Sequence, residues 1–202
     1  MFVALIPAAG KSRRMGQAKL ALRLGQQTVL EHLVDALKKA GIEKVLIVVG
    51  PHVSQLAHAA ERKNVQTLRL AEETPDMQAT VVLGLRELQR LFQPADQDWL
   101  VLVPGDHPLV GSETLRELMV AAQSAAESII VPTSAGRRGH PALIRWSHVP
   151  AILRFPANVG LNKYLRQFAE ETLEYSVSGD DVLIDLDTPE DYRRLLERWN
   201  KE

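Results

Sequence analysis

The chain of 202 residues contains no cysteine, and this absence excludes disulfide bonds, cysteine-ligated zinc and thiol catalysis. It also has almost no net charge, because 24 Lys and Arg residues stand against 25 Asp and Glu residues. Bulk attraction to nucleic acid or to an anionic membrane is therefore not expected. No apolar run approaches the ~20 residues that a membrane helix needs, and the short N-terminal run ends in a proline and a basic loop, unlike a signal peptide. We expect a cytoplasmic protein that binds neither nucleic acid nor membrane.

Three common nucleotide-binding or catalytic motifs are missing as well. The chain has no G-x-x-x-x-G-K-[ST] and no G-x-G-x-x-G sequence, so a kinase-like P-loop and a dinucleotide-binding loop are not expected. It has no serine in a G-x-S-x-G context, which argues against a hydrolase with a Ser-His-Asp triad.

What the chain does contain is an alternation of short apolar runs with longer amphipathic stretches. The apolar runs consist almost entirely of Val, Ile and Leu, which is the composition of strands buried on both faces of a parallel sheet. The predicted strands are Phe2–Ile6, Val45–Val49, Leu100–Val103, Ile129–Val131 and, with a weaker pattern, Val65–Leu70. The predicted helices are Val29–Ala40, Val53–Arg62, Met77–Leu91 and Ser112–Ala126, the last with Ser112 as its N-cap. We therefore predict an α/β fold with a doubly wound, mostly parallel sheet and helices on both faces, as in Rossmann-like proteins.

The alternation changes after Pro132. We predict a polar loop over Thr133–Gly139 and a final helix with Thr188 as N-cap and Pro189 as its first residue. Between them we predict the short strands Ala142–Ile144, Leu173–Val177 and Val182–Leu186 and the short helices Val149–Arg154 and Leu161–Phe168. No repeat, low-complexity stretch or linker divides the chain, so we expect one domain over residues 1–202.

The first apolar run leads directly into a small basic loop. After Pro7 come small residues, two glycines and four cations, the latter at Lys11, Arg13, Arg14 and Lys19. Glycine and alanine let backbone N–H groups come close to a polyphosphate, and successive N–H groups form an anion-binding concavity. Lysine and arginine then neutralise the remaining charge. The loop is either such a polyphosphate site or a solvated basic turn between a strand and a helix.

Aspartates lie at the ends of two other predicted strands. Asp106 comes after the run Leu100–Val103, at a strand end where ligands bind in open α/β sheets. It is either a ligand of a divalent cation or a turn residue that caps the next helix, whose cap Ser112 already provides. Asp185 and Asp187 would share one face of a predicted strand, which is costly unless a cation or a base lies between them. The alternative for Asp187 is that it only supports the N-terminus of the final helix.

These motifs resemble those of the MobA-like nucleotidyltransferases, and in particular the molybdenum cofactor cytidylyltransferases, along nearly the whole chain. The family's L-A-A-G, x-S-x-R-M-G and lysine match at Ala8, Ala9, Gly10, Ser12, Arg14, Met15, Gly16 and Lys19, and Pro7 replaces the usual leucine. The family's G-D-M-P, G-x-x-G-H-P and D-I-D-T-P-E-D motifs match at Gly105–Pro108, Gly136–Pro141 and Asp185–Asp191, with His107 in place of methionine. In the family's base-binding segment, here Glu72–Thr80, Met77 and Thr80 fit, whereas Asp76, Gln78 and Ala79 do not.

The resemblance implies a role for each matched residue. It implies nucleotide binding by Pro7, Ala8, Ala9, Gly10, Ser12, Arg14, Lys19, Met77 and Thr80. It implies that Arg14, Lys19 and Asp106 are catalytic, and that Asp106 binds Mg²⁺ together with Asp187, or with Asp185 as the second choice. It implies acceptor binding by Arg138, Gly139 and His140, in a segment whose alternative reading is an exposed turn. Residues 1–132 would then form the nucleotide-binding part of the domain and residues 133–202 the acceptor side.

The function that the resemblance implies is transfer of NMP to a phosphate-bearing acceptor with release of pyrophosphate. Ala9, where the guanylyl branch has glycine, favours CTP over GTP. Molybdopterin is the first choice of acceptor and a sugar phosphate the second, and a molybdoenzyme or its chaperone would be a further partner. The alternative is a non-catalytic nucleotide-binding protein of the same fold. Departures from the motifs favour that alternative, and the retention of Arg14, Lys19 and Asp106 opposes it.

Overall fold

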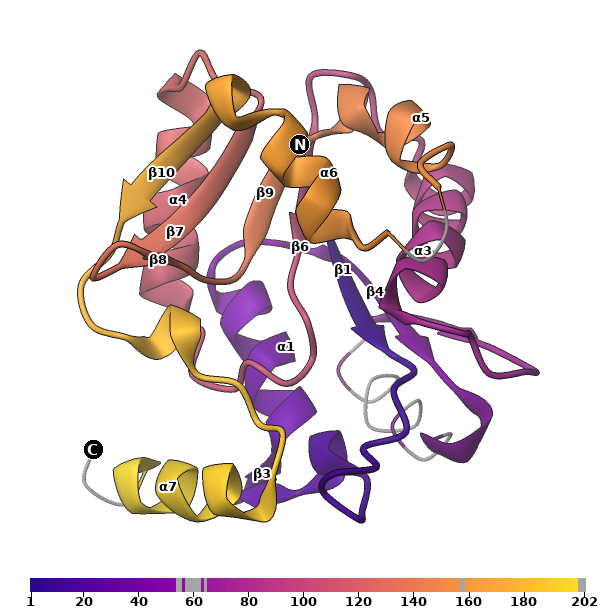
Figure 1. The fold of residues 1–202 in the computed structure, drawn as a ribbon, viewed down its shortest axis with the longest axis vertical. Coiled ribbons are helices and arrows are strands. Elements are labelled where there is room, and N and C mark those ends of the chain that lie inside the picture. The colour runs from indigo at the N-terminus through magenta and orange to yellow at the C-terminus, as the bar shows by residue number, and fades with distance from the viewer. Residues whose placement is uncertain (54–55, 57–62, 64, 157–158, 200–202) are drawn as a thin grey trace.

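A central sheet organises the protein. The computed structural model describes residues 1–53, 56, 63, 65–156 and 159–199. Within them, eight strands form one sheet in the order β10-β7-β9-β6-β1-β4-β5, with β8 paired to β7 (Figure 1). The strands of the sheet are β1 (Phe2–Ala8), β4 (Lys44–Val49), β5 (Gln66–Arg69), β6 (Trp99–Leu102), β7 (Ile129–Ser134), β8 (Arg137–Arg138), β9 (Ala142–Arg145) and β10 (Thr172–Ser176). A separate two-stranded ribbon consists of β2 (Arg23–Leu24) and β3 (Gln27–Thr28).

Most neighbouring strands of the sheet run in the same direction. β1 pairs in parallel with both β4 and β6, β4 pairs in parallel with β5, and β10 pairs in parallel with β7. β9 is antiparallel to β6 and β7, and β8 is antiparallel to β7. The central strands β1, β4 and β6 are buried almost throughout, which their continuous apolar sequences require. The predicted mostly parallel α/β sheet is therefore confirmed.

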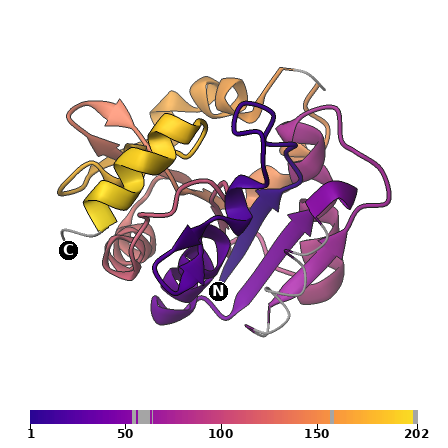
Figure 2. The ribbon, with the colours of Figure 1, turned by 90° about the horizontal axis from the view of Figure 1, so that it is seen from below.

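Helices cover both faces of this sheet, because successive side chains of a strand point to opposite sides. In β1, Ala4 and Ile6 belong to one core cluster with α1, α4 and α7, whereas Val3 and Leu5 belong to a second cluster with α3, α5 and α6 (Figures 1 and 2). The helices are α1 (Val29–Lys39), α3 (Met77–Phe92), α4 (Ser112–Ser124), α5 (Val149–Ile152), α6 (Leu161–Gln167) and α7 (Pro189–Trp199). α3 packs very closely on β1, since a methyl group at Gly84 would lie 2.5 Å from Leu5 Cδ1.

The starts of two helices test the predicted caps. At α7, Thr188 Oγ1 accepts a hydrogen bond from the N–H of Asp191 at 3.2 Å, and the Asp191 carboxylate accepts one from the N–H of Thr188 at 2.8 Å. The predicted cap at Thr188 is thus confirmed. The predicted cap at Ser112 is wrong, because Ser112 is already the first residue of α4 and the N-cap, Gly111, has no side chain that could cap.

The segment predicted as a polar loop after Pro132 is a β-hairpin. β7 continues to Ser134, and β8 pairs with it antiparallel across a two-residue turn. The turn residues Ala135 and Gly136 have φ angles of 48° and 74°. Two consecutive positive φ values give the tight turn whose twist matches that of the flanking strands. The predicted loop over Thr133–Gly139 is therefore wrong on both sides of the turn, because the polar residues at 133–134 and 137–138 pair as strands.

The segment Val182–Leu186 is not the strand that its apolar pattern predicts. Its first part forms a 3₁₀ turn and the rest has no regular structure. Its backbone groups bind other loops instead of a neighbouring strand. The carbonyl of Val182 accepts a hydrogen bond from the N–H of His140, and the N–H of Leu186 donates to the carbonyl of Asp106, both at 2.9 Å. The alternating side-chain directions of a strand therefore do not determine where Asp185 and Asp187 point.

The remaining predicted elements follow the sequence pattern, with small shifts at their ends. The weak strand predicted at Val65–Leu70 is present as β5, and the short elements predicted after Pro141 are present as β9, α5, α6 and β10. The helix predicted at Val53–Arg62 lies almost entirely outside the described residues.

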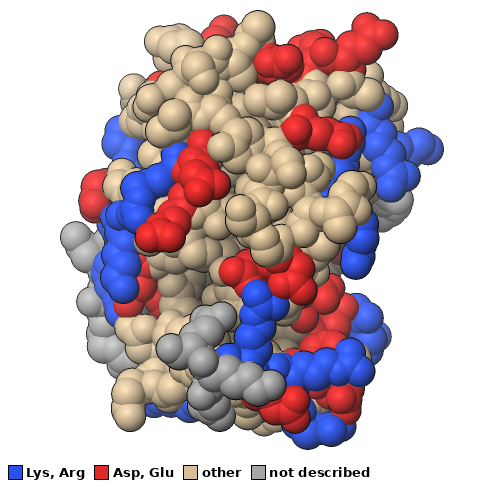
Figure 3. Space-filling view, turned by 90° about the vertical axis from the view of Figure 1, so that its left-hand side faces the viewer, with Lys and Arg blue, Asp and Glu red and all other residues tan. Residues whose placement is uncertain are grey.

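The surface carries both signs of charge. Figure 3 shows the face at the left of Figure 1, where basic and acidic side chains lie next to one another rather than in one basic patch. Within the described part of the chain, no helix is both long enough and apolar enough to cross a membrane.

Candidate functional site

The ends of three neighbouring strands meet at one edge of the sheet. β1 ends at Ala8 and leads into residues 9–18, and β6 ends at Leu102 and leads into residues 103–108. β9 is antiparallel to β6 and begins at Ala142, so the segment before it reaches the same edge. The carboxyl ends of parallel strands are where open α/β sheets bind ligands.

The loop after β1 is held by a turn at Ser12. Ser12 has a φ of 49°, and its carbonyl accepts hydrogen bonds from the N–H groups of Met15 and Gly16, each at 3.0 Å. Its Oγ accepts a hydrogen bond from the N–H of Lys19 at 3.3 Å. A methyl group at Gly10 would meet no atom within 4 Å, so the backbone there borders open space. A ligand can therefore approach this part of the loop closely.

A lysine joins carboxylates from two distant loops. Lys19 Nζ lies 2.7 Å from Asp106 Oδ2 and 2.7 Å from Asp187 Oδ1. A guanidinium nitrogen of Arg14 lies 2.7 Å from Asp187 Oδ2. The hydrogen bond from Leu186 to the carbonyl of Asp106 ties the two loops together. Asp106 and Asp187 thus direct their side chains at cations, and neither caps a helix within the described residues. We call Arg14, Lys19, Asp106 and Asp187 the Lys19 cluster.

The Lys19 cluster shifts pKa values in both directions. The hydrogen bond from Lys19 lowers the pKa of Asp187 and outweighs burial, which raises it. Burial alone would lower the pKa of Lys19, but the charges and hydrogen bonds of Asp106 and Asp187 raise it above its usual value. Burial raises the pKa of Asp185, and the negative charges of Asp187 and Asp106 raise it further. Lys19 and Asp187 therefore remain charged at neutral pH, and Asp185 is harder to ionise than a free aspartate.

Two histidines lie against each other beside the cluster. The ring centroids of His107 and His140 are 4.5 Å apart. Burial, and after it the neighbouring His107, lowers the pKa of His140 to about 4, so this ring is neutral at pH 7. A Cβ atom at Gly139 would collide with the carbonyl oxygen of Val182, so glycine permits the hydrogen bond from His140 to that carbonyl. Both Nδ1 atoms, and also Asp106 Oδ1, are buried without a hydrogen-bond partner in the described structure.

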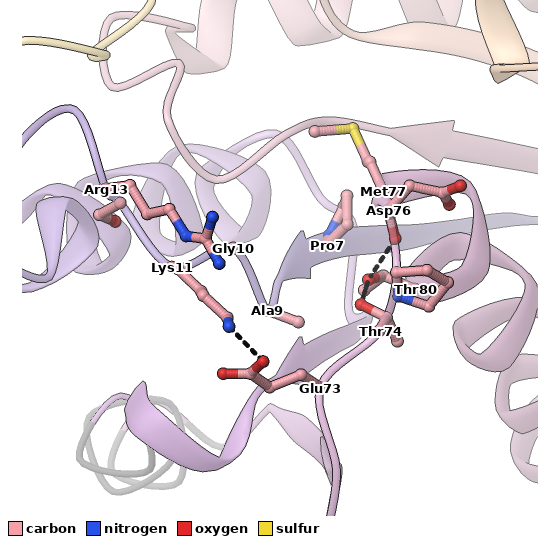
Figure 4. A pocket seen from close by; sticks show the side chains of 12 residues that line it. Pro7, Ala9, Gly10, Lys11, Arg13, Glu73, Thr74, Asp76, Met77 and Thr80 are labelled. Atoms are coloured by element: carbon pink, nitrogen blue, oxygen red, sulfur yellow. Dashed lines mark hydrogen bonds and ion pairs between the residues drawn. The ribbon is translucent and has the colours of Figure 1, made fainter. Parts of the chain in front are cut away.

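Three adjoining cavities surround these residues. The first, of about 490 Å³, lies between the loop after β1 and the start of α3 (Figure 4). We call it the phosphate-loop pocket, after the polyphosphate binding that the sequence predicts for this loop. Figure 4 shows Lys11 and Glu73 pointing toward one another across it, as an ion pair. The central cavity, of about 610 Å³, contains the Lys19 cluster and shares with this pocket Pro7, Asp76 and Met77. The rim cavity, of about 190 Å³, lies between β8 and α6 and shares with the central cavity His140, Ala142, Asn162 and Leu165.

The structure brings most of the predicted site residues to these cavities. The phosphate-loop pocket is lined, among others, by Pro7, Ala9, Gly10, Ser12, Met77 and Thr80. The central cavity is lined, among others, by Arg14, Lys19, Asp106, Asp185, Asp187 and His140. The rim cavity is lined, among others, by Arg138, Gly139 and His140. Ala8 is the exception, because its side chain is buried in the core on one face of the sheet.

Gln78 lines the central cavity, and the sequence did not reveal this residue. It is only 5% exposed. Its Nε2 donates to the carbonyls of Pro156 and Phe155 at 2.9 Å and 3.3 Å, and its Oε1 accepts from the N–H of Gly160 at 2.9 Å. Gln78 thus ties the start of α3 to the segment before α6. The only signal in the sequence was a mismatch to the family's base-binding segment, which says nothing about these contacts.

Comparison with known proteins decides the family of the chain. The model of the MobA-like NTP transferase domain matches residues 4–173. The chain belongs to the MobA-like NTP transferase family. The resemblance inferred from the motifs is therefore confirmed. The match includes the loop after β1, Asp106 and His140, whereas Asp185 and Asp187 lie beyond it.

Individual similar proteins cover nearly all of the chain. The molybdenum cofactor cytidylyltransferase of Escherichia coli K12 is 26% identical over 200 residues, which are 98% of this chain and 96% of that protein. The crystal structure of Rv0371c from Mycobacterium tuberculosis is 28% identical, has a TM-score of 0.82 and covers 98% of this chain and 99% of that one. Rv0371c has also been solved in complex with manganese. A nucleotidyl transferase from Methanothermobacter has the same fold, with a TM-score of 0.83 at 22% identity over 100% of this chain and 98% of that one.

Proposed function

We propose that this MobA-like protein transfers the CMP of CTP to a phosphate-bearing acceptor and releases pyrophosphate. The observation that carries this proposal is the Lys19 cluster, which lines the central cavity. This cavity adjoins the phosphate-loop pocket, which is lined by the loop after β1. Cations and carboxylates in a cavity that adjoins the phosphate-loop pocket suit the transfer of a charged group from a ligand in that pocket to a ligand in the cavity. The E. coli molybdenum cofactor cytidylyltransferase supports molybdopterin as the first choice of acceptor. A molybdoenzyme or its chaperone would then receive the product.

In the proposed reaction the nucleotide lies in the phosphate-loop pocket and the acceptor lies in the central and rim cavities. An oxygen of the acceptor phosphate attacks the α-phosphorus of CTP, and the bond from that phosphorus to the bridging oxygen of pyrophosphate breaks. Arg14 and Lys19 neutralise the charge that develops on the leaving pyrophosphate. The attacking phosphate is already anionic, so the protein's main contributions are alignment and charge stabilisation.

The residues of the site fit a divalent cation. Asp106 Oδ1 is buried without a partner in the described structure, and carboxylate oxygens are the donors that Mg²⁺ prefers. No group of three His, Cys, Asp or Glu residues in the described part of the chain is arranged to hold a metal. Asp106 and Asp187, with Asp185 as the second choice, would therefore share the ion with triphosphate oxygens. When bound, the cation neutralises charge on the triphosphate and acts as a Lewis acid. The manganese complex of Rv0371c supports the binding of a divalent cation, without identifying its ligands.

The proposed preference for CTP rests on Ala9, which lines the phosphate-loop pocket. Its methyl group narrows the space beside the base, and the larger purine would meet it first. One methyl group in a pocket is worth about 1–3 kcal/mol, or about 10–200-fold in discrimination. We expect CTP to bind more tightly than GTP and Ala9→Gly to narrow the difference, as measured by competition binding with all four NTPs. Equal or tighter binding of GTP would overturn the cytidylyl assignment but leave the nucleotidyltransferase assignment in place.

A pyrophosphate-release assay tests the proposal as a whole. The protein is incubated with Mg²⁺, each of the four NTPs and either molybdopterin or a series of sugar phosphates. We expect release with CTP and molybdopterin, and its loss in Asp106→Asn, a variant of nearly the same shape. Release of pyrophosphate only with a sugar phosphate would identify a sugar phosphate, the second choice, as the acceptor. Nucleotide binding without release for any acceptor would assign a non-catalytic binding protein.

A further inference from the structure

The four carboxylate oxygens of Asp106 and Asp187 are almost fully occupied. Lys19 Nζ contacts one oxygen of each carboxylate, and Arg14 contacts the second oxygen of Asp187. The fourth oxygen, Asp106 Oδ1, is buried, and His107 Nε2 lies 4.0 Å from it. The ammonium of Lys19 therefore lies between the two carboxylates that we propose as metal ligands.

An ammonium and a divalent cation cannot share this position. Mg²⁺ binds carboxylate oxygens at about 2.0–2.1 Å. An ion held by both aspartates would need an oxygen of Asp187, and Lys19 and Arg14 each contact one of these two oxygens at 2.7 Å. The side chains of Lys19, Asp106 and Asp187 are only 15%, 17% and 23% exposed, so solvent screens the repulsion between two cations weakly. An ion held by both aspartates must therefore displace a cation from Asp187, and the ammonium of Lys19 is the cation that lies between the two carboxylates.

The proposed second position of the Lys19 ammonium is reached by rotation of its side chain. The backbone N–H of Lys19 is anchored to Ser12 Oγ, within the loop that lines the phosphate-loop pocket. The lysine side chain has a flexible stem of four carbons and ends in an ammonium group, a point charge with three hydrogen-bond donors. A triphosphate bound by the loop would offer this ammonium new anionic oxygens in exchange for the two carboxylates.

We propose that Lys19 keeps free metal ions out of this site, and that the protein takes up the metal only as a metal–triphosphate complex, whose phosphates bind the ammonium while its metal binds Asp106 and Asp187. The inference rests on the proposed function, because it identifies the form in which that substrate binds. It gives Lys19 two successive partners, carboxylates in the free protein and phosphates in the complex.

Binding of Mn²⁺ without nucleotide tests the exchange. Mn²⁺ is titrated into wild type, Lys19→Met and the double variant Lys19→Met/Asp106→Asn, and free Mn²⁺ is measured by electron paramagnetic resonance. Lys19→Met should bind Mn²⁺ more tightly than wild type, by about 5–150-fold, the usual range for coupling between two sites. Adding Asp106→Asn should remove the gain, which would place the ion at the cluster.

A matched variant controls for the loss of one positive charge. Arg13 lies in the same loop and lines the phosphate-loop pocket, and none of the ion pairs described for Asp106 or Asp187 involves it. Arg13→Met should therefore leave the Mn²⁺ affinity close to that of wild type. An equal gain in Arg13→Met would mean that overall charge causes the effect, and this would overturn the proposal.

The outcomes separate this proposal from the proposed function. Equal Mn²⁺ affinities in wild type and in a folded Lys19→Met, measured without nucleotide, would overturn the exchange. A wild-type protein that binds no NTP in the presence of Mn²⁺ would instead overturn the proposed function. Supporting results are weak Mn²⁺ binding by wild type alone, tight binding once CTP is added, and loss of that CTP effect in Lys19→Met.

Discussion

Two regions of the molecule hold a cation against a carboxylate at the same distance in different surroundings. In the central cavity, Lys19 is 15% exposed and lies 2.7 Å from each of two carboxylates. At the rim, Arg138 lies 2.7 Å from Glu174, and these side chains are 35% and 49% exposed. The distance between the two charges therefore does not by itself determine how much an ion pair contributes to stability or to activity. Solvent screens the rim pair, whereas removing Lys19 from the central cavity takes away the cation that contacts Asp106 and leaves Asp187 with Arg14 alone.

We expect the largest effect from a substitution in the central cavity. Lys19→Ala should lower the rate of nucleotidyl transfer by about 10²–10³-fold, because charge on the leaving pyrophosphate would lose its fixed partner. The rate is measured as pyrophosphate release at saturating Mg²⁺ and CTP. Circular dichroism should confirm an unchanged fold, and a rate equal to that of wild type would remove Lys19 from the catalytic residues.

The second effect concerns pH and His140, which lines both the central and the rim cavity. Its pKa of about 4 in the folded protein lies below the ordinary value near 6.5. Between these pH values the unfolded chain binds a proton that the folded chain does not, so stability falls as the pH falls through this window. The pKa difference corresponds to about 3 kcal/mol for this group.

Chemical denaturation at a series of pH values measures this loss. Other groups titrate in the same range, so the informative quantity is the difference between wild type and His140→Gln. Wild type should lose stability more steeply than the variant between about pH 6.5 and pH 4. Parallel curves would mean that His140 can take up a proton in the folded state.

The third effect concerns Gln78, which connects the nucleotide side to the acceptor side. Gln78→Ala should lower the free energy of unfolding by about 1–3 kcal/mol, because it removes the hydrogen bonds of a buried side chain to the backbone of Pro156 and Gly160. Urea denaturation gives the value. Gln123→Ala, at an exposed position of α4, is the matched control and should change stability by less than about 0.5 kcal/mol. Equal effects of the two substitutions would contradict the anchoring role.

The smallest effect is expected at the rim. Arg138→Ala should change the free energy of unfolding by only about 0–1 kcal/mol, because its partner Glu174 is half exposed and solvent screens the pair. If Arg138 binds the acceptor, the same variant should raise the KM for the acceptor and leave the KM for CTP unchanged. A large loss of stability would show that the exposure of an ion pair does not decide how much it contributes to stability in the two regions.

The sequence predicted best where one local rule was sufficient. β1, β4 and β6 follow from continuous apolar runs, and the start of α7 follows from Thr188 and its first-turn acids. The strand predicted at Val182–Leu186 failed because distant backbone groups compete for the same residues. Val182–Leu186 has the alternation of a strand, but its N–H and carbonyl groups are used by the loops that carry Asp106 and His140. The approach of Asp187 to Asp106 therefore arises from loop contacts and not from the predicted strand face.

By itself, the sequence determined the strand–loop–helix order, the small basic loop and the types of residue available for chemistry. These depend on neighbours in the chain, through side-chain periodicity, glycine geometry and helix capping. Only the tertiary structure decided which groups meet. Asp106 and Asp187 are 87 and 168 residues from Lys19 in the chain, and both lie 2.7 Å from it in the structure. No local pattern encodes such a contact, because it depends on how two irregular loops pack at the same edge of the sheet.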